Sequence, residues 1–310
     1  MNEIPPGHTS GEDATDVFVG YRQLLYSIAY NMLGNVADVE DVLQDVWLAW
    51  TANAKNRSEP VANPRAYLVR MAINQALSRR AAISRRREVY VGQWLPEPIV
   101  ADAPLSTAPV ESADAVGHED LFSMALLVVL ESLSPAERAV FVLHEAFGFS
   151  HPEIAEILGR NPTAVRQLAH RARSHVQARR PRYHSDPRVR EEVTERFVSA
   201  ALGGDLKALM DVLSPDVTLW TDGGGKGPAV SLQPVYGRRR VADVFLRVAA
   251  NNHENLGIRS RAVNVNGDHS ALVYSEGSPL AIVVVEVTES DELVREIYSV
   301  TNPDKLSRIR

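Results

Sequence analysis

The 310-residue sequence contains no cysteine, and that absence removes two kinds of chemistry. Without thiols the chain can form neither disulfide bonds nor thiolate metal sites, which suits a reducing compartment. Long apolar runs are lacking too: no stretch reaches the length of a membrane-spanning helix, and the polar N-terminus has no signal-peptide core. We therefore expect a cytoplasmic protein without a membrane partner.

A complete phosphate-binding loop is also missing, although residues 221–227 (TDGGGKG) resemble one. Backbone N–H groups of a glycine-rich turn can cradle an anion beside a lysine. A P-loop, however, needs Gly, four residues and then Gly-Lys-Ser/Thr leading into a helix. Here Lys226 is followed by Gly227, Pro228 and a strand-like segment. The spacing disfavours nucleotide binding and leaves a glycine-rich hairpin end as the plain alternative. We expect no cofactor and no metal.

Acidic residues are absent from two arginine-rich segments, although the net charge is −6. Residues 64–87 contain seven arginines and no acid, and residues 159–182 show the same composition. Either segment alone could be a solvated helix face. Two such segments in an acidic chain indicate two contacts with a phosphate backbone.

Apolar periodicity predicts helices over residues 14–82. In residues 35–50 one face is apolar, and the opposite face carries Asp38, Asp41, Gln44 and Asp45. A basic helix follows, on which Arg70, Asn74 and Ser78 share one face. Such a polar stripe can present donors to phosphates or bases.

Residues 88–117 have the composition of a linker, rich in Pro, Ala, Ser and acids. Two helix starts then follow, at Ser134-Pro135 and Ser150-Pro152, each with glutamate at the third helical position. This pattern predicts two capping boxes. Residues 154–175 then have the spacing of a helix-turn-helix, with the turn at 159–161.

The second helix of this motif has an exposed basic face. Arginine and glutamine form bidentate contacts with guanine and adenine in the major groove, and the start of a recognition helix reaches the bases. The candidates for DNA binding here are Asn161, Thr163, Arg166, Gln167, His170 and Arg171.

Beyond residue 182 the periodicity changes from helix to strand. Helices over 187–213 precede the strand-like runs VTLW, AVSLQPVY, IRSRAVNV, SALVYSEG, PLAIVVVEV and VREIYSV, with one helix at 238–252. This order predicts an α+β domain with a mostly antiparallel, curved sheet.

DVEDVLQDVW with NPRAYLVRMAINQALSRR resembles region 2 of an extracytoplasmic-function (ECF) RNA polymerase sigma factor. LSPAERAVFVLHEAFGFSHPEIAEILGRNPTAVRQLAHRAR resembles region 4, and the C-terminal part resembles SnoaL-like domains of the nuclear-transport-factor-2-like fold. WLPEP, DGGGK and NPDKL match the subgroup that carries such a domain behind region 4. The resemblance implies region 2 at 14–87, a linker at 88–117, region 4 at 118–182 and a cone-shaped α+β SnoaL-like domain at 184–310.

The resemblance also implies partners, namely core RNA polymerase and promoter DNA. Region 2 would dock on the polymerase β′ clamp through Asp41, Gln44, Asp45 and Leu48. It would bind the melting minus-ten element through Arg65, Arg70, Asn74, Arg79 and Arg80, with flipped bases held in pockets. Region 4 would place Arg166, Gln167, His170 and Arg171 in the minus-thirty-five element. A linker between two weak contacts would control binding through their effective concentration.

Three functions remain open for the C-terminal domain. As in the fused subgroup, it would regulate in cis, with Lys226 meeting Glu97 and with Trp94 as apolar anchor. The residues implied in this regulation are Trp94, Glu97, Asp222, Gly223, Gly224, Gly225, Lys226, Asn302, Asp304 and Lys305. Alternatively, its cavity binds a small-molecule ligand. Catalysis by Asp222, Tyr236, His253 or Tyr274 is the third function; no titratable pair at a diagnostic spacing supports it, so we expect no enzyme.

For the whole chain, the rival to a sigma factor is a helix-turn-helix regulator that acts without polymerase and carries a sensing or enzymatic C-terminal domain. The acidic-faced helix followed by a basic helix in residues 35–82 favours the sigma factor, since a repressor needs no such block.

Overall fold

A computed structural model describes residues 11–56, 61–87, 90–101, 122–179, 186–227, 231–252, 257–288 and 290–309. The chain divides into two compact units. The first combines Met1–Ile83 with Leu133–His175, and the second combines Ser84–Ser132 with Val176–Arg310. Among the helices within these described ranges, none is long and apolar enough to cross a membrane.

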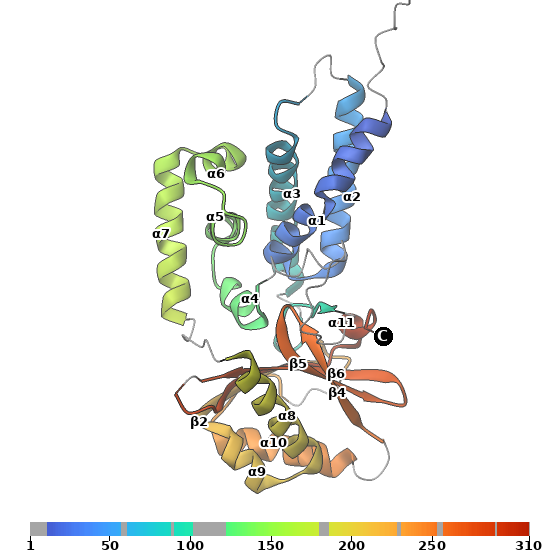
Figure 1. The fold of residues 1–310 in the computed structure, drawn as a ribbon, viewed down its shortest axis with the longest axis vertical. Helices are drawn as coiled ribbons and strands as arrows, with labels where there is room; N and C mark the ends of the chain where they lie inside the picture. The colour runs from blue at the N-terminus through green and yellow to red at the C-terminus, as the bar shows by residue number, and fades with distance from the viewer. Residues whose placement is uncertain are drawn as a thin grey trace, which may run out of the picture. The chain divides into compact units, whose positions relative to one another are not determined.

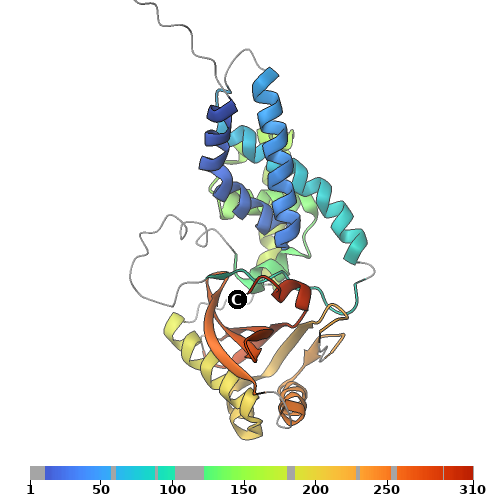
Figure 2. The same ribbon diagram turned by 90° about the vertical axis from the view of Figure 1, so that its right-hand side faces the viewer.

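The first unit begins with three long helices, α1 (Gly11–Leu33), α2 (Val36–Asn56) and α3 (Pro64–Arg87). Helices α1 and α2 lie side by side in both ribbon views (Figures 1 and 2). The apolar stripe expected on α2 faces the core, where Val39, Val42 and Val46 are fully buried. Trp50 closes the end of the stripe and donates from Nε1 to the Ala14 carbonyl at 2.7 Å. The amphipathic pattern thus turns Asp41 and Gln44 outward, whereas Asp38, expected on the same polar face, is buried at 7% exposure with Arg79 at 3.8 Å.

Three further helices complete this unit: α5 (Pro135–Glu145), α6 (His151–Leu158) and α7 (Pro162–Arg179). Both capping boxes are confirmed, since the Ser134 and Ser150 side chains accept from the backbones of Glu137 and Glu153, and each glutamate reaches back. Gly159 ends α6 in the left-handed conformation, at φ 61°. The expected helix-turn-helix of α6 and α7 is therefore present.

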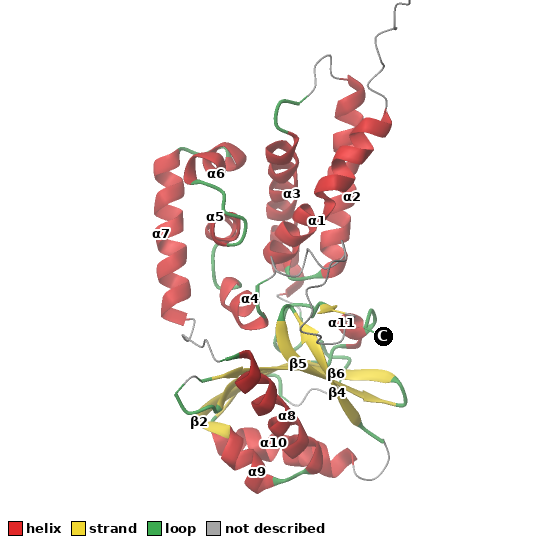
Figure 3. Cartoon of the chain, in the orientation of Figure 1, coloured by secondary structure: helices red, strands yellow, loops and turns green. Residues whose placement is uncertain are grey.

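The second unit is an α+β fold around one sheet, drawn yellow in Figure 3. Its helices are α4 (Met124–Leu130), α8 (Pro187–Gly203), α9 (Leu206–Val212), α10 (Arg238–Asn252) and α11 (Pro303–Leu306). Its strands are β1 (Val100–Ala101), β2 (Leu213–Asp222), β3 (Val235–Tyr236), β4 (Arg259–Val265), β5 (Asp268–Ser275), β6 (Ser278–Val287) and β7 (Val294–Val300). The strand order is β1-β4-β5-β6-β7-β2-β3, and only the β2–β7 pair is parallel among these pairings.

The sequence-based strands are confirmed except at two places. The run AVSLQPVY yields only the two residues of β3, while residues 228–230 lie outside the described residues. In addition, β1 arises from the segment expected as an irregular linker. Val100 pairs with Val265, and Ile99 exchanges two hydrogen bonds with Asn266. The end of WLPEP thereby becomes an edge strand, whereas residues 102–117 lie outside the described residues.

The sheet is covered on both faces. Helices α8, α9 and α10 cover one face, with Phe197, Leu209 and Val241 in its core. On the other face Leu95 of the linker, Met124 of α4 and Leu306 of α11 pack against Val284 and Val300. Because Leu95 and Met124 are fully or almost fully buried there, the linker and α4 belong to the hydrophobic core of this unit.

Candidate functional site

Asp222, at the end of β2, is the centre of a buried polar cluster in the second unit. Its side chain is fully buried, and a buried carboxylate requires partners that replace water. Oδ2 accepts the Leu95 N–H at 2.8 Å and lies 2.6 Å from the Lys305 ammonium. Oδ1 accepts the Tyr90 hydroxyl at 2.5 Å. Asp222 thus binds two positions of the linker and one of α11.

Lys305 completes the cluster from the C-terminal side. Besides its ion pair with Asp222, its ammonium donates to the Leu95 carbonyl and lies 4.3 Å from the centre of the Trp94 ring. Leu95 is therefore held through both its N–H and its carbonyl group. Asn302, the N-cap of α11, donates to the Tyr90 hydroxyl at 2.7 Å. Burial is the main cause that raises the pKa of Tyr90, and its hydrogen bond to Asp222 adds to the effect.

The glycines of residues 222–226 permit this close approach. Gly224 and Gly225 adopt positive φ, at 59° and 72°, in the turn after β2. A Cβ atom on Gly224 would meet the Asn302 amide and the Tyr90 hydroxyl, and one on Gly225 would lie 3.0 Å from Val91. The turn contacts the linker through its backbone surface, and Gly223 accepts from the N–H groups of Lys226 and Gly227 to close it. The N–H groups of Lys226 and Gly227 are thus used within the turn itself.

The expected pairing of Lys226 with Glu97 is wrong. Lys226 binds Asp304 at 2.6 Å, and both side chains are mostly exposed. Glu97 is buried at 5% exposure. The two side chains therefore differ in environment: Lys226 lies at the surface with Asp304, whereas Glu97 lies in the interior. The lysine that contacts the linker is Lys305.

Trp94 is only half-buried, and the deeper apolar contact is Leu95, at 1% exposure. Of the residues expected in this site, the structure brings together Trp94, Asp222, Gly223, Gly224, Gly225, Asn302 and Lys305 around the linker. Sequence reasoning missed Tyr90 and Leu95. The signal that the sequence offers for Leu95 is an apolar residue inside the proline-rich WLPEP segment; nothing local distinguishes Tyr90.

The catalytic alternative finds no support at the residues proposed for it. Asp222 is occupied by the linker, Tyr236 is 58% exposed on β3, and Tyr274 packs against the core. His253 lies outside the described residues.

In the first unit, α7 presents the expected polar face. Thr163, Arg166, Gln167 and His170 are exposed, while Leu168 and Ala169 are buried. Arg166 donates to the Thr163 hydroxyl at 3.1 Å. Asn161 caps the helix by accepting the Ala164 N–H at 2.7 Å, and Arg171 pairs with Glu137 of α5 at 3.2 Å. A contiguous donor face therefore remains for a ligand.

The acidic face of α2 is exposed at Asp41, Gln44 and Leu48, and Leu48 retains half of its accessible surface. Arg79 of α3, which is expected to bind DNA, contacts this face. Its guanidinium lies 2.9 Å from Asp41 and 3.4 Å from Asp45. One arginine thus links the two faces that sequence reasoning assigned to different partners.

The remaining basic residues of α3 differ in their contacts. Arg70 and Asn74 are exposed on one face, one turn apart. Arg80 donates to the Met32 carbonyl at the end of α1, at 2.9 Å. Arg65 lies over the Phe149 ring at 4.5 Å. Arg70 and Asn74 are therefore the members of this set best placed for a partner.

Contacts also join α1 to α5. Arg138 is fully buried, and its Nε donates to the Asn31 carbonyl at 2.7 Å. A buried guanidinium requires such acceptors, so the contact depends on the two helices staying together.

Comparisons with known proteins agree with this architecture. The Sigma-70 region 2 family model matches residues 17–86, and the Sigma-70 region 4 model matches residues 123–176. The ECF RNA polymerase sigma factor SigJ of Mycobacterium tuberculosis is 36% identical over 298 residues, covering 94% of this chain and 92% of that protein. The probable ECF sigma factor SigI of the same species is 34% identical over 229 residues, covering 73% and 74%. The crystal structure of SigJ superposes with a TM-score of 0.69 over 94% of this chain and 98% of that one.

Proposed function

The chain belongs to the ECF RNA polymerase sigma factors, which direct transcription initiation, and on that premise we propose that its C-terminal domain restrains initiation in cis. The observation that carries the proposal is the Asp222 cluster. It fixes Tyr90 and Leu95, just after region 2, to the domain that follows region 4.

The physical basis is the distance between the two promoter elements. The minus-ten and minus-thirty-five elements are centred about 25 base pairs apart, as their names state. At roughly 3.4 Å per base pair this separation amounts to about 85 Å. The contacts of Arg138 with Asn31 and of Arg65 with Phe149 hold regions 2 and 4 together in the free chain. These contacts have to break before both elements are bound at once, so this arrangement is a resting one.

The C-terminal domain would act on that change through the linker. A flexible linker sets the range of separations that two binding modules can span. Here the segment from Tyr90 to Ala101 is bound to the domain, through Asp222, Lys305 and strand β1. Met124 at the start of α4 packs in the same core. Both ends of the connection are thereby anchored, which shortens its reach.

We assign the polymerase surface to the exposed face of α2. Leu48 offers apolar area beside the carboxylates of Asp41 and Asp45, a combination that suits a partner with a basic rim. Promoter contacts are assigned to Arg70 and Asn74 for the minus-ten element and to the exposed face of α7 for the minus-thirty-five element.

Run-off transcription by core RNA polymerase from the region upstream of this protein's gene tests the restraint. The variants Asp222→Asn and Lys305→Met release the linker, and we expect several-fold more transcript than with the unaltered chain. Lys226→Met, which removes an exposed ion pair beside the cluster, is the matched control and should leave the amount of transcript unchanged. Truncation after residue 182 is less informative, because it would strip the apolar cover from Leu95 and Met124.

Unchanged transcript from both linker variants, with folding verified by circular dichroism, would refute the restraint. Less transcript from these variants would mean that the C-terminal domain assists initiation, with the anchored linker as part of the active arrangement.

A further inference from the structure

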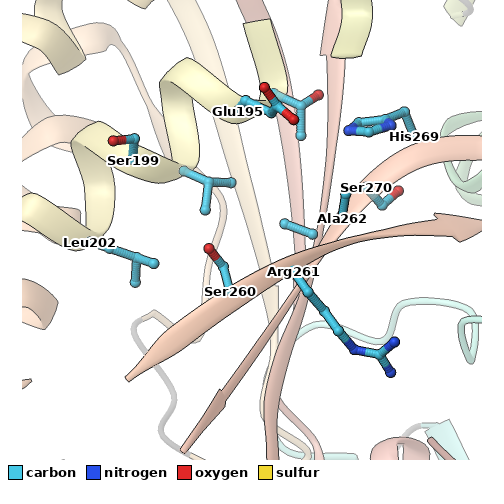
Figure 4. A pocket seen from close by; sticks show the side chains of 11 residues that line it. Glu195, Ser199, Leu202, Ser260, Arg261, Ala262, His269 and Ser270 are labelled. Atoms are coloured by element: carbon cyan, nitrogen blue, oxygen red, sulfur yellow. The ribbon is translucent and has the colours of Figure 1, made fainter. Parts of the chain in front are cut away.

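Helix α8 and strand β5 bring together three side chains that none of the preceding functions uses. Glu191 and Glu195 come from α8 and His269 from β5, and one potential ligand atom of each lies within 4.8 Å of the others. Figure 4 shows the imidazole of His269 directed toward the Glu195 carboxylate at one end of a pocket. Because successive turns of a helix stack residues four apart, both glutamates face the same point.

His269 is the unusual member of this cluster. His269 is only 9% exposed. Its buried Nε2 has no hydrogen-bond partner among the residues that the structure describes. Buried polar atoms in folded proteins are almost always satisfied. An imidazole nitrogen aimed at two carboxylates without a bond to either calls for a third component between them.

The two glutamates lack a neutralising partner as well. Both are exposed, and neither forms an ion pair with any residue in the described part of the chain. Like charges four residues apart destabilise a helix. Arg190, the residue before Glu191 on α8, is bound to Asp268 at 2.5 Å. A cation placed between the glutamates would relieve their repulsion.

We propose that Glu191, Glu195 and His269 bind a divalent transition-metal ion of the zinc class. One imidazole nitrogen and two carboxylate oxygens form a donor set that zinc accepts, whereas magnesium and calcium prefer oxygen alone. Zinc–ligand bonds of about 2.0–2.2 Å require the three donors to close slightly, which exposed glutamate side chains can do by rotation. The site is independent of the cis restraint.

The pocket beside the cluster shows what else could bind there. It has a volume of about 370 Å³, and Glu195 and His269 line it together with Ser260 and Arg261. Three protein ligands leave coordination positions for water or for an oxygen ligand, as in open zinc sites. A small oxygen ligand fits such a pocket, where the hydroxyl of Ser260 also lies.

Equilibrium dialysis of the full chain against Zn²⁺, after treatment with a chelator, tests the site, and Co²⁺ serves as a visible spectroscopic probe. We expect one strongly bound equivalent. Its affinity should fall by roughly tenfold or more in Glu191→Gln and in Glu195→Gln, since loss even of outer-shell groups has that effect. Both glutamates are exposed, so these variants should fold. Glu192→Gln, an exposed neighbour on α8 outside the cluster, is the matched control and should bind as the unaltered chain does.

The chain has nine histidines, and His144 and His151 stack at 4.6 Å in region 4, so zinc binding alone would not suffice. The proposal is overturned if no equivalent binds, or if Glu191→Gln and Glu195→Gln leave the affinity unchanged. It is equally overturned if His151→Asn, and not Glu195→Gln, removes the bound ion. Loss of the Co²⁺ spectrum in His269→Asn, with retained circular dichroism, would support nitrogen ligation by His269.

Discussion

Lys305 lies 2.6 Å from Asp222, 83 residues earlier in the chain, and both side chains are almost completely removed from solvent. The neighbouring pair of Lys226 with Asp304 has the same length, but each of its side chains is more than 60% exposed. The two ion pairs therefore differ in energy although they are equally long. In the exposed pair water screens both charges, whereas in the buried pair each charge depends on the other.

Lys305→Met should accordingly destabilise the C-terminal domain by about 3–5 kcal/mol, because it leaves the Asp222 carboxylate buried and without its counter-charge. Lys226→Met should change the free energy of unfolding by less than about 1 kcal/mol. Urea unfolding followed by tryptophan fluorescence measures both variants. Combining Lys305→Met with Asp222→Asn should recover part of the loss, since the double variant contains no unpaired buried charge. Equal effects of the two lysine variants would contradict this account.

Gly227→Ala should destabilise the same domain by about 1–3 kcal/mol, the usual range for overpacking. The added Cβ atom would lie 2.2 Å from the Thr301 carbonyl oxygen, so the backbone itself has to move. Gly203→Ala, at the end of α8 with open space around it, is the control. It should be neutral or stabilise by up to about 1 kcal/mol, because alanine favours the helix. Thermal unfolding compares the two, and a harmless Gly227→Ala would show that the turn is not packed as described.

Local signals allowed the helices to be predicted from the sequence. Ser134 and Ser150, each followed by proline and then glutamate, specify a capping box within four residues, and both are present. The apolar spacing of α2 likewise fixes which face is buried. These features depend on neighbours in the chain, which is why periodicity and capping rules suffice for them.

The contacts of the candidate site, by contrast, could not be predicted from such local rules. The resemblance implies both Lys226 and Lys305, and the pattern of DGGGK favours Lys226 as the lysine that meets the linker, whereas Lys305 contacts it in the structure. Which lysine is buried follows from a packing arrangement between residues 83 positions apart. In the same way β1 consists of only two residues, and its pairing with β4 is a long-range contact that the strand propensity of Ile99 and Val100 alone does not specify.

Arg166→Ala should weaken binding to a promoter fragment by about 1–3 kcal/mol and relax discrimination at one base pair. Arg166 is exposed on α7, and its side chain donates to the Thr163 hydroxyl on the same helix. Arg171→Ala should weaken binding less, because Arg171 already pairs with Glu137. Titrations at a fixed salt concentration, with substituted minus-thirty-five sequences, measure both affinity and discrimination. The reverse order would place Arg171, released from Glu137, at the bases instead.

The C-terminal domain should become more stable as the pH falls from neutral toward about 4.5. Glu296 of β7 is the reason: burial raises its pKa, although the hydrogen bond from Tyr298 and the charge of Arg295 oppose that shift. A group with a raised pKa binds its proton more tightly in the folded state. The contribution of this proton to stability is therefore complete below the unfolded-state pKa, near 4.5, and is lost as the pH rises through the folded-state pKa.

The variant Glu296→Gln tests this account. It retains an oxygen that accepts from Tyr298 but carries no charge, so it should raise the free energy of unfolding at pH 7 and flatten this part of the pH dependence. Urea unfolding between pH 4.5 and pH 8 compares the variant with the unaltered chain. Glu292→Gln, in the exposed turn before β7, is the control that should leave the profile unchanged. A variant less stable than the unaltered chain at pH 7 would mean that the Glu296 charge is satisfied by its neighbours.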